Sequence, residues 1–147
     1  MKSILTIAVG IIMMVLVAAQ IPGSENENAG TSAIQFKSGS WNEVLALAKK
    51  ENKPVFLDIS ASWCGYCKRM KANVFTDVEV AKYYNSNFIN VAVDGEKGEG
   101  IDLAKKYGVK GYPTFVFLNP DGSLAYQTSG YHNPEKFLEL GKNVVNK

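Results

Sequence analysis

Two cysteines, Cys64 and Cys67, are the residues of this 147-residue chain whose spacing most directly suggests chemistry. They are its only cysteines, and they lie in the sequence WCGYCK at positions 63–68. Thiols separated by two residues can close a small disulfide and open it again, and a helix that begins at the first thiol stabilises its thiolate through the helix dipole. The spacing therefore predicts a redox-active dithiol.

Two other uses of the cysteine pair are less favoured. A disulfide that closes so short a loop removes little entropy from the unfolded chain, so it would be a weak structural bridge. A zinc site would need two further ligands, and His132 is the only histidine. We therefore expect no metal and no cofactor, and we leave His132 outside the site.

The patterns along the chain predict the elements that would hold the dithiol. The apolar run 55–59, which only Asp58 interrupts, is typical of a buried central strand. Ser40 and Glu43 form a capping box at the start of the first helix. The patterns predict helices over 40–50, 64–74 with a bend before 77, 78–84, 101–107 and 133–145, and strands over 34–36, 55–59, 88–93, 114–118 and 123–128.

The first 33 residues carry a different kind of signal. Residues 1–19 contain one lysine, a long uncharged apolar run and small residues at their end, which is typical of a secretory signal peptide cleaved after Ala19. An uncleaved membrane anchor is the alternative, since the apolar run is only slightly shorter than a membrane span. Residues 20–33 predict a flexible linker, which leaves 34–147 as a single domain.

Either alternative sends the domain across a membrane, to the periplasm or the outside of the cell. Disulfides persist there, so a dithiol enzyme would find substrates. The formal net charge is +2, and acidic and basic residues are interspersed. We therefore expect no nucleic-acid partner.

Four markers follow one another along the chain: Asp58, WCGYCK at 63–68, Gly-Tyr-Pro-Thr at 111–114, and Gly130. Because they appear in the order found in one family, residues 34–145 resemble thioredoxin-fold proteins. Residues 71–80 and the loop before Ile101 look most like the periplasmic C-terminal domain of the transmembrane thiol:disulfide interchange protein and its secreted relatives. The resemblance implies an α/β thioredoxin fold, with a central mixed sheet flanked by helices and the active site where a strand meets a helix.

The resemblance also implies catalytic roles. Cys64, nearer the helix N-terminus and more exposed, would attack a substrate disulfide, and Cys67 would resolve the mixed disulfide. Asp58 would accept a proton from Cys67, because a lone carboxylate in an apolar strand is desolvated and its pKa is raised. The alternative for Asp58 is a structural acid turned toward a loop.

Four further residues would bind the substrate by the same resemblance. Trp63 would shield the dithiol, or it would lie in the core. Pro113 is expected to follow a cis peptide bond, which would leave the backbone of Tyr112 free to pair with an extended substrate, whereas a trans proline would merely open a strand. Gly130 would let a backbone approach the site closely.

Two positions depart from the family pattern. Asn90 stands where thioredoxins carry a lysine on the neighbouring strand, which leaves the proton relay through Asp58 open. Ala72 stands where thioredoxins often have a helix-kinking proline, so we expect a straighter helix. Lys68 and Arg69 add positive charge near the site, and as helix-surface residues we expect them to be solvated.

We expect a secreted monomer that reduces disulfide-containing proteins and is kept reduced by a membrane-bound thiol electron donor. The dipeptide Gly65-Tyr66 tunes the potential without setting its direction, so a disulfide oxidase or isomerase stays open. A different class is a non-enzymatic binding module, either chaperone-like or a carrier of a thiophilic metal such as copper(I) on the two thiolates. A metal carrier would need neither Asp58 nor a cis proline.

Overall fold

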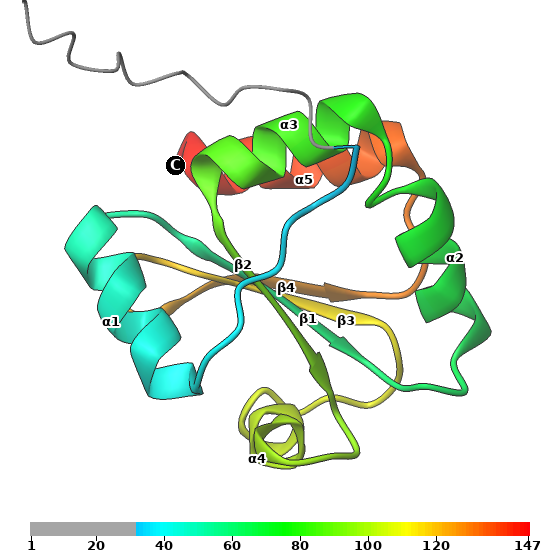
Figure 1. The fold of residues 1–147 in the computed structure, drawn as a ribbon, viewed down its shortest axis with the longest axis horizontal. Coiled ribbons are helices and arrows are strands. Elements are labelled where there is room, and N and C mark those ends of the chain that lie inside the picture. Colours follow the sequence, from blue (N-terminus) through cyan, green and yellow to red (C-terminus); the bar gives the residue numbers. More distant parts are fainter. Residues whose placement is uncertain (1–31) are drawn as a thin grey trace, which may run out of the picture.

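The computed structural model describes residues 32–147. The predicted signal peptide, residues 1–19, and residues 20–31 of the predicted linker lie outside the described residues. The elements in chain order are α1 (Trp41–Glu51), β1 (Val55–Ser60), α2 (Gly65–Asn73), α3 (Val78–Asn87), β2 (Ile89–Asp94), α4 (Glu99–Lys106), β3 (Thr114–Leu118), β4 (Leu124–Ser129) and α5 (Pro134–Val145) (Figure 1).

The four strands form one mixed sheet in the order β2-β1-β3-β4. β1 pairs with β2 in parallel and with β3 antiparallel, and β3 pairs with β4 antiparallel. Helices flank this sheet, and Figure 1 shows α3 and α5 side by side on one face with α4 on the other. The α/β fold with a central mixed sheet is therefore confirmed.

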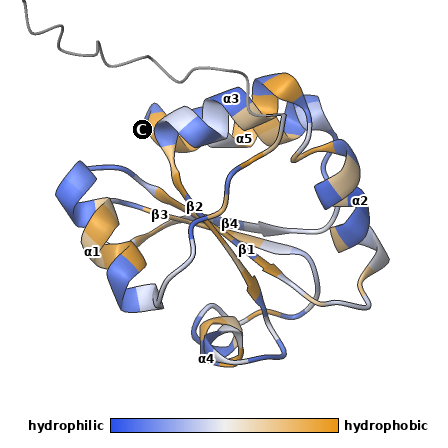
Figure 2. Cartoon of the chain, in the orientation of Figure 1, coloured by the Kyte–Doolittle hydropathy of each residue, from blue (hydrophilic) through white to orange (hydrophobic). Residues whose placement is uncertain are grey.

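Side chains alternate between the two faces of β1 and contribute to a separate apolar core on each. Phe56 packs with residues of α2, α3 and α5, whereas Val55, Leu57 and Ile59 pack with residues of α1 and α4. All six residues of β1 are buried, as the continuous apolar run predicted. Figure 2 shows hydrophobic colour along the central strands and mixed colours on the helices, which is typical of amphipathic helices that cover a buried sheet.

The close packing of α3 against α5 depends on one ring and one glycine. The rings of Tyr84 and Phe137 stack with centroids 4.8 Å apart and planes 8° apart, and the Tyr84 hydroxyl donates to the Phe137 carbonyl at 2.8 Å. Gly141 lies one turn further along α5, and a Cβ there would be 2.9 Å from the Tyr84 ring. The missing side chain at position 141 therefore makes room for the ring.

The predicted strand over 34–36 is wrong. The Ile34 N–H donates to the Phe75 carbonyl at 2.7 Å, whereas the Lys37 N–H donates to the Asn90 carbonyl of β2 at 2.8 Å. The segment thus bonds first to the connection after α2 and then to the sheet. Backbone groups that find partners in different elements form no ladder.

The other boundaries agree with the prediction to within a few residues. α3 runs three residues further than predicted, to Asn87, and α4 begins two residues earlier, at Glu99. The chain turns over 74–77, and the Asp77 carboxylate caps α3 by accepting two backbone N–H groups of its first turn, both at 3.1 Å. The bend predicted before Asp77 is therefore a break between two helices.

Candidate active site

The two cysteines form a disulfide where β1 passes into α2. Cys64 occupies the N-cap position of α2, and the Cys67 N–H donates to Cys64 Sγ at 3.1 Å. An N–H of the first helical turn aimed at a sulfur stabilises negative charge on it, and the helix dipole acts in the same sense. Cys64 is therefore the thiol better suited to react as a thiolate.

Exposure does not separate the two cysteines in the disulfide form. Cys64 is 3% exposed and Cys67 is 2% exposed, so both are buried in this form and the expected greater exposure of Cys64 stays a prediction for the dithiol form. Both pack in a small cluster with Ala61, and Tyr112 lies against that cluster. The difference between the thiols comes from their places in the helix and not from solvent access.

Trp63, which precedes Cys64 in the sequence, is an aromatic residue on the surface. It is 66% exposed, so the alternative of a core aromatic is wrong. Its indole Nε1 donates to both carboxylate oxygens of Glu96, at 3.1 and 3.2 Å. Its ring lies edge-on to that of Tyr112, with centroids 6.0 Å apart. The Trp63 side chain is thus fixed by its hydrogen bonds to Glu96 and by its edge-on contact with Tyr112.

The ring of Tyr112 packs directly against Gly95. A Cβ at Gly95 would be 2.7 Å from the Tyr112 ring and 2.9 Å from Ile59 Cγ2, so only glycine leaves the ring in place. The Gly95 N–H donates to the Ser60 carbonyl at 2.8 Å, which ties this loop to the end of β1. The loop over 94–98 therefore forms part of the site.

Sequence reasoning missed the contribution of this loop, and of Glu96 in particular. Parallel pairing of the two strands would have indicated this contribution, because parallel strands bring their carboxyl ends to the same edge of a sheet. β2 is parallel to β1, so the residues that follow β2 lie beside the segment that leads to the cysteines.

The Tyr112–Pro113 peptide bond is cis, as the resemblance implied. The Gly130 N–H donates to the Pro113 carbonyl at 2.9 Å, which brings the end of β4 to this turn. Gly130 has a φ of +86°, which favours glycine, and an added Cβ would meet nothing within 4 Å. The structure thus joins Gly130 to Pro113 and places Tyr112 against the dithiol, whereas their roles toward a substrate stay predictions.

Asp58 is buried in β1 with 1% of its surface exposed, so it is not turned toward a loop. Neither carboxylate oxygen has a hydrogen-bond partner among residues 32–147. Burial raises the pKa of Asp58 to about 7, and the positive charge of Lys71 opposes this rise. A carboxyl with this pKa can accept or release a proton near neutral pH.

Asp58 lies on the face of β1 that α2 covers. Because side chains alternate along a strand, Asp58 shares this face with Phe56, which packs in the same core as Met70 of α2. Met70 and Cys67 both belong to the buried side of α2, one turn apart. The side of α2 that carries Cys67 therefore lies over the strand face that carries Asp58.

Asn90, which stands at the family's lysine position, bonds to α3. Its Nδ2 donates to the Tyr84 carbonyl at 3.2 Å and to Asn85 Oδ1 at 3.3 Å. The position is 2% exposed. A neutral amide therefore serves the packing of α3 where thioredoxins would place a charge.

The segment after Gly130 packs beside α2. The Arg69 guanidinium lies 4.6 Å from the centre of the Tyr131 ring, and the His132 N–H donates to Met70 Sδ at 3.5 Å. Burial and the charge of Lys136 lower the pKa of His132, so this imidazole is neutral at pH 7. Its contacts are those of a packing residue.

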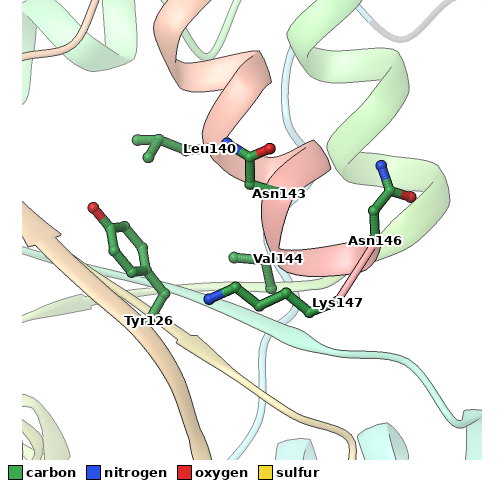
Figure 3. Close-up of a pocket in the computed structure, with 6 residues that line it drawn as sticks. All are labelled: Tyr126, Leu140, Asn143, Val144, Asn146 and Lys147. Atoms are coloured by element: carbon green, nitrogen blue, oxygen red, sulfur yellow. The ribbon is translucent and has the colours of Figure 1, made fainter.

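A cavity of about 510 Å³ lies between β4 and the C-terminal end of α5 (Figure 3). Its lining contains neither a cysteine nor an acidic side chain. The lining residues are Tyr126, Leu140, Asn143, Val144, Asn146 and Lys147.

Two further observations concern the described part of the chain. Over residues 32–147, no three His, Cys, Asp or Glu side chains are grouped so that they could hold a metal ion. Within the same range, no helix combines the length and the apolar character that crossing a membrane requires.

Comparison with known proteins gives a consistent result. A family model described as a thioredoxin-like domain matches residues 41–144. This range begins at the first residue of α1 and ends one residue before the last of α5, so it includes the whole sheet and both cysteines.

Individual relatives match the same region. The thiol:disulfide interchange protein DsbD of Yersinia pestis is 32% identical over 101 residues, which are 67% of this chain and only 17% of that protein. The C-terminal domain of Neisseria meningitidis DsbD, in its oxidised form, superposes with a TM-score of 0.61 and 30% identity over 76% of this chain and 98% of the domain. A Bacteroides thetaiotaomicron protein described as a candidate disulphide-isomerase superposes with a TM-score of 0.70 and 41% identity over 80% of this chain and 97% of that protein.

Proposed function

Because the chain belongs to the thioredoxin-like family and carries the Cys64–Cys67 pair, it is a disulfide oxidoreductase, and we propose that it reduces the disulfides of other proteins after export. The observation that carries the proposal is the hydrogen bond from the Cys67 N–H to Cys64 Sγ at 3.1 Å. It prepares Cys64 to attack as a thiolate. The reducing direction is part of this proposal, and the reduction potential of the Cys64–Cys67 pair tests it.

The proposed reaction starts from the reduced dithiol. The Cys64 thiolate attacks a substrate disulfide, so that a mixed disulfide forms and one substrate thiolate leaves. The Cys67 thiol then gives its proton to the Asp58 carboxylate and attacks Cys64 Sγ. The mixed disulfide breaks, the second substrate thiolate leaves, and the Cys64–Cys67 disulfide remains. Two electrons have passed to the substrate.

We propose that the substrate binds along the rim formed by Trp63, Tyr112, Pro113 and Gly130. The Tyr112 backbone would pair with an extended segment of the substrate, as in strand addition, and the exposed Trp63 ring would cover an apolar residue beside the disulfide. Gly130 leaves open space at the other end of the turn.

The electron donor and the location belong to the same proposal. The similarity to DsbD supports a membrane-bound thiol donor that returns the protein to its dithiol form, and it supports export to the periplasm. The apolar run within residues 1–19 supports export independently. We propose that the domain acts there as a monomer on disulfide-containing proteins.

Trapping of the mixed disulfide tests the proposed roles of the cysteines. Cys67→Ser retains the first attack and should accumulate a covalent complex with a disulfide-bonded protein substrate, whereas Cys64→Ser should form none. Non-reducing electrophoresis after acid quenching reads this out. Equal trapping by the two variants would contradict the assignment of Cys64 as the attacking thiol.

A disulfide isomerase or oxidase is the second candidate. It is favoured by the 41% identity to the Bacteroides thetaiotaomicron protein, which is described as a candidate disulphide-isomerase. Refolding of a scrambled disulfide protein separates the two activities, because an isomerase restores native pairing whereas a reductase leaves free thiols. A carrier of copper(I) on the two thiolates is separated by metal analysis, since it would hold stoichiometric copper and exchange no disulfides.

A further inference from the structure

Lys71 connects α2 to the end of β1. Its Nζ donates to Ser60 Oγ at 3.3 Å, and Ser60 is 5% exposed. Lys71 follows Cys67 by one helical turn on α2. The lysine stem therefore spans from the helix to the sheet, and its ammonium group bonds to a buried hydroxyl although the residue as a whole is exposed.

The hydroxyl that holds this ammonium group lies on the strand face of Asp58. Residues two apart in a strand point to the same side, so Ser60 and Asp58 share the face that α2 covers. The two Asp58 oxygens have no hydrogen-bond partner among the described residues. A nearby positive charge is then the main compensation for ionising this carboxyl.

We propose that Lys71, held by Ser60, is the positioning cation for Asp58, and that it favours the ionised carboxylate that takes the proton of Cys67. The inference rests on the proposed function, in which Asp58 serves the resolving thiol. The direction of the Lys71 effect supports this inference, because the positive charge of Lys71 lowers the Asp58 pKa that burial raises. The cation would come from α2, because β2 carries the neutral Asn90 at the family's lysine position.

The strands beside Asp58 supply no positive charge of their own. β2 and β3 place Ala92 and Phe115 opposite Asp58 in the sheet. Asp94, at the end of β2, is paired with Ser60 in the sheet, and its carboxylate meets Lys97 at 3.5 Å. Lys97 thus forms its ion pair with Asp94.

The buried groups that the remaining elements place on this face are neutral. Tyr84 of α3 and Phe137 of α5 belong to the core on this side, and burial raises the pKa of Tyr84, which stays protonated. The ring centroid of His132 lies 6.0 Å from that of Phe115, and its lowered pKa leaves it uncharged at pH 7. On α2, the disulfide-bonded Cys67 carries no charge.

The direct test is the titration of the Asp58 carboxyl, followed by carbon NMR in the disulfide form, in which the cysteines do not titrate. Lys71→Met keeps the apolar stem and removes the charge, so the midpoint should rise by about half a pH unit or more. Lys71→Arg should keep the wild-type midpoint. Lys68→Met is the matched control, since it removes the same charge from the same helix. A midpoint that stays fixed in Lys71→Met, or that rises equally in Lys68→Met, would overturn the proposal.

A second variant tests whether Ser60 acts through Lys71. Ser60→Ala should raise the Asp58 midpoint in the wild-type background and add little in a Lys71→Met background, because the hydroxyl then has no ammonium group to hold. An equal shift in both backgrounds would remove Ser60 from the proposal.

The pH dependence of mixed-disulfide resolution separates this inference from the proposed function. If Asp58 takes the Cys67 proton, the rate profile of Lys71→Met should move upward together with the Asp58 midpoint, which makes resolution at pH 7 roughly twofold slower. A shifted Asp58 midpoint with an unchanged rate profile would uphold the pairing of Lys71 with Asp58 and would contradict the catalytic role of Asp58.

Discussion

Trp63 donates its indole N–H to both carboxylate oxygens of Glu96, at 3.1 and 3.2 Å, across 33 positions of sequence. An exposed ring would otherwise sample several rotamers, and ordering it during binding would cost free energy. Glu96 orders Trp63 before the substrate arrives. The loop after β2 thus contributes to the surface on which we propose that the substrate binds.

We predict that Glu96→Ala weakens the binding of protein substrates. With the indole free to move, KM for a protein disulfide should rise about threefold, whereas the reaction of Cys64 with a small disulfide reagent should stay unchanged. Asp102→Ala, which removes an exposed acid from α4, is the control and should leave both values at wild type. Steady-state reduction assays measure both. An unchanged KM in Glu96→Ala would show that Trp63 needs no fixed position.

We predict that Gly95→Ala displaces Tyr112 and lowers the reduction of protein disulfides. A Cβ at Gly95 would lie 2.7 Å from the Tyr112 ring and 2.9 Å from Ile59, and the buried Ile59 gives the loop little freedom to retreat. We expect kcat/KM for a protein substrate to fall by about tenfold.

Gly111→Ala is the matched control for this change, because a Cβ at Gly111 would meet nothing within 4 Å. It alters the same turn from its open side and should retain most of the activity. If Gly95→Ala and Gly111→Ala are equally active, the packing of Tyr112 against Gly95 has no functional role.

Much of this site could be predicted from the sequence because its central parts are local motifs. The cysteine pair and the acid within an apolar strand are each read within a few residues, and the cis proline was implied by its short motif. Glu96 and Lys71 could not be predicted in this way, since each acts on a residue brought near by the fold, as in the bond from Lys71 to Ser60.

In the fold, too, features that depend on neighbouring residues could be predicted and those that depend on distant residues could not. The capping box at Ser40 depends on neighbouring residues and is confirmed, and the bend predicted before Asp77 is a break between α2 and α3. The strand predicted at 34–36 would have depended on distant partners. The N–H groups of Ile34 and Lys37 bond to residues 75 and 90, which the local apolar pattern does not reveal.

We predict that Asp58→Asn stabilises the protein at high pH and changes little at low pH. The pKa of Asp58 is about 7 when folded and near 4 when unfolded, so between these values the folded protein keeps a proton that the unfolded chain has lost. Stability therefore falls as the pH rises from 4 to 7 and stays lower above 7. Removing the carboxyl should raise the free energy of unfolding at pH 8 by an amount on the order of a few kcal/mol.

Urea unfolding of the disulfide form at pH 4 and pH 8 measures this difference. Asp102→Asn, a change at an exposed acid, should give nearly the same small effect at both values. An Asp58→Asn effect that is independent of pH would mean that the buried carboxyl titrates alike in the folded and unfolded chains.

We predict that Gly141→Ala destabilises the domain, although alanine normally favours a helix over glycine by about 1 kcal/mol. The new Cβ would lie 2.9 Å from the buried Tyr84 ring, which is already stacked on Phe137. Overpacking of this kind costs about 1–3 kcal/mol. Asn143→Ala, at an exposed position of α5, should be neutral or stabilising. Thermal unfolding compares the two, and a stabilised Gly141→Ala would show that α3 and α5 can separate without cost.

The reduction potential of the Cys64–Cys67 pair tests the central claim most directly. The full chain is equilibrated with thiol–disulfide buffers of known potential, and the reduced fraction is read by alkylation of the free thiols. A reductase of protein disulfides requires a potential near that of thioredoxin, about −270 mV, and this is the result we predict. A potential near −120 mV would identify an oxidant and would contradict the proposed direction of electron flow.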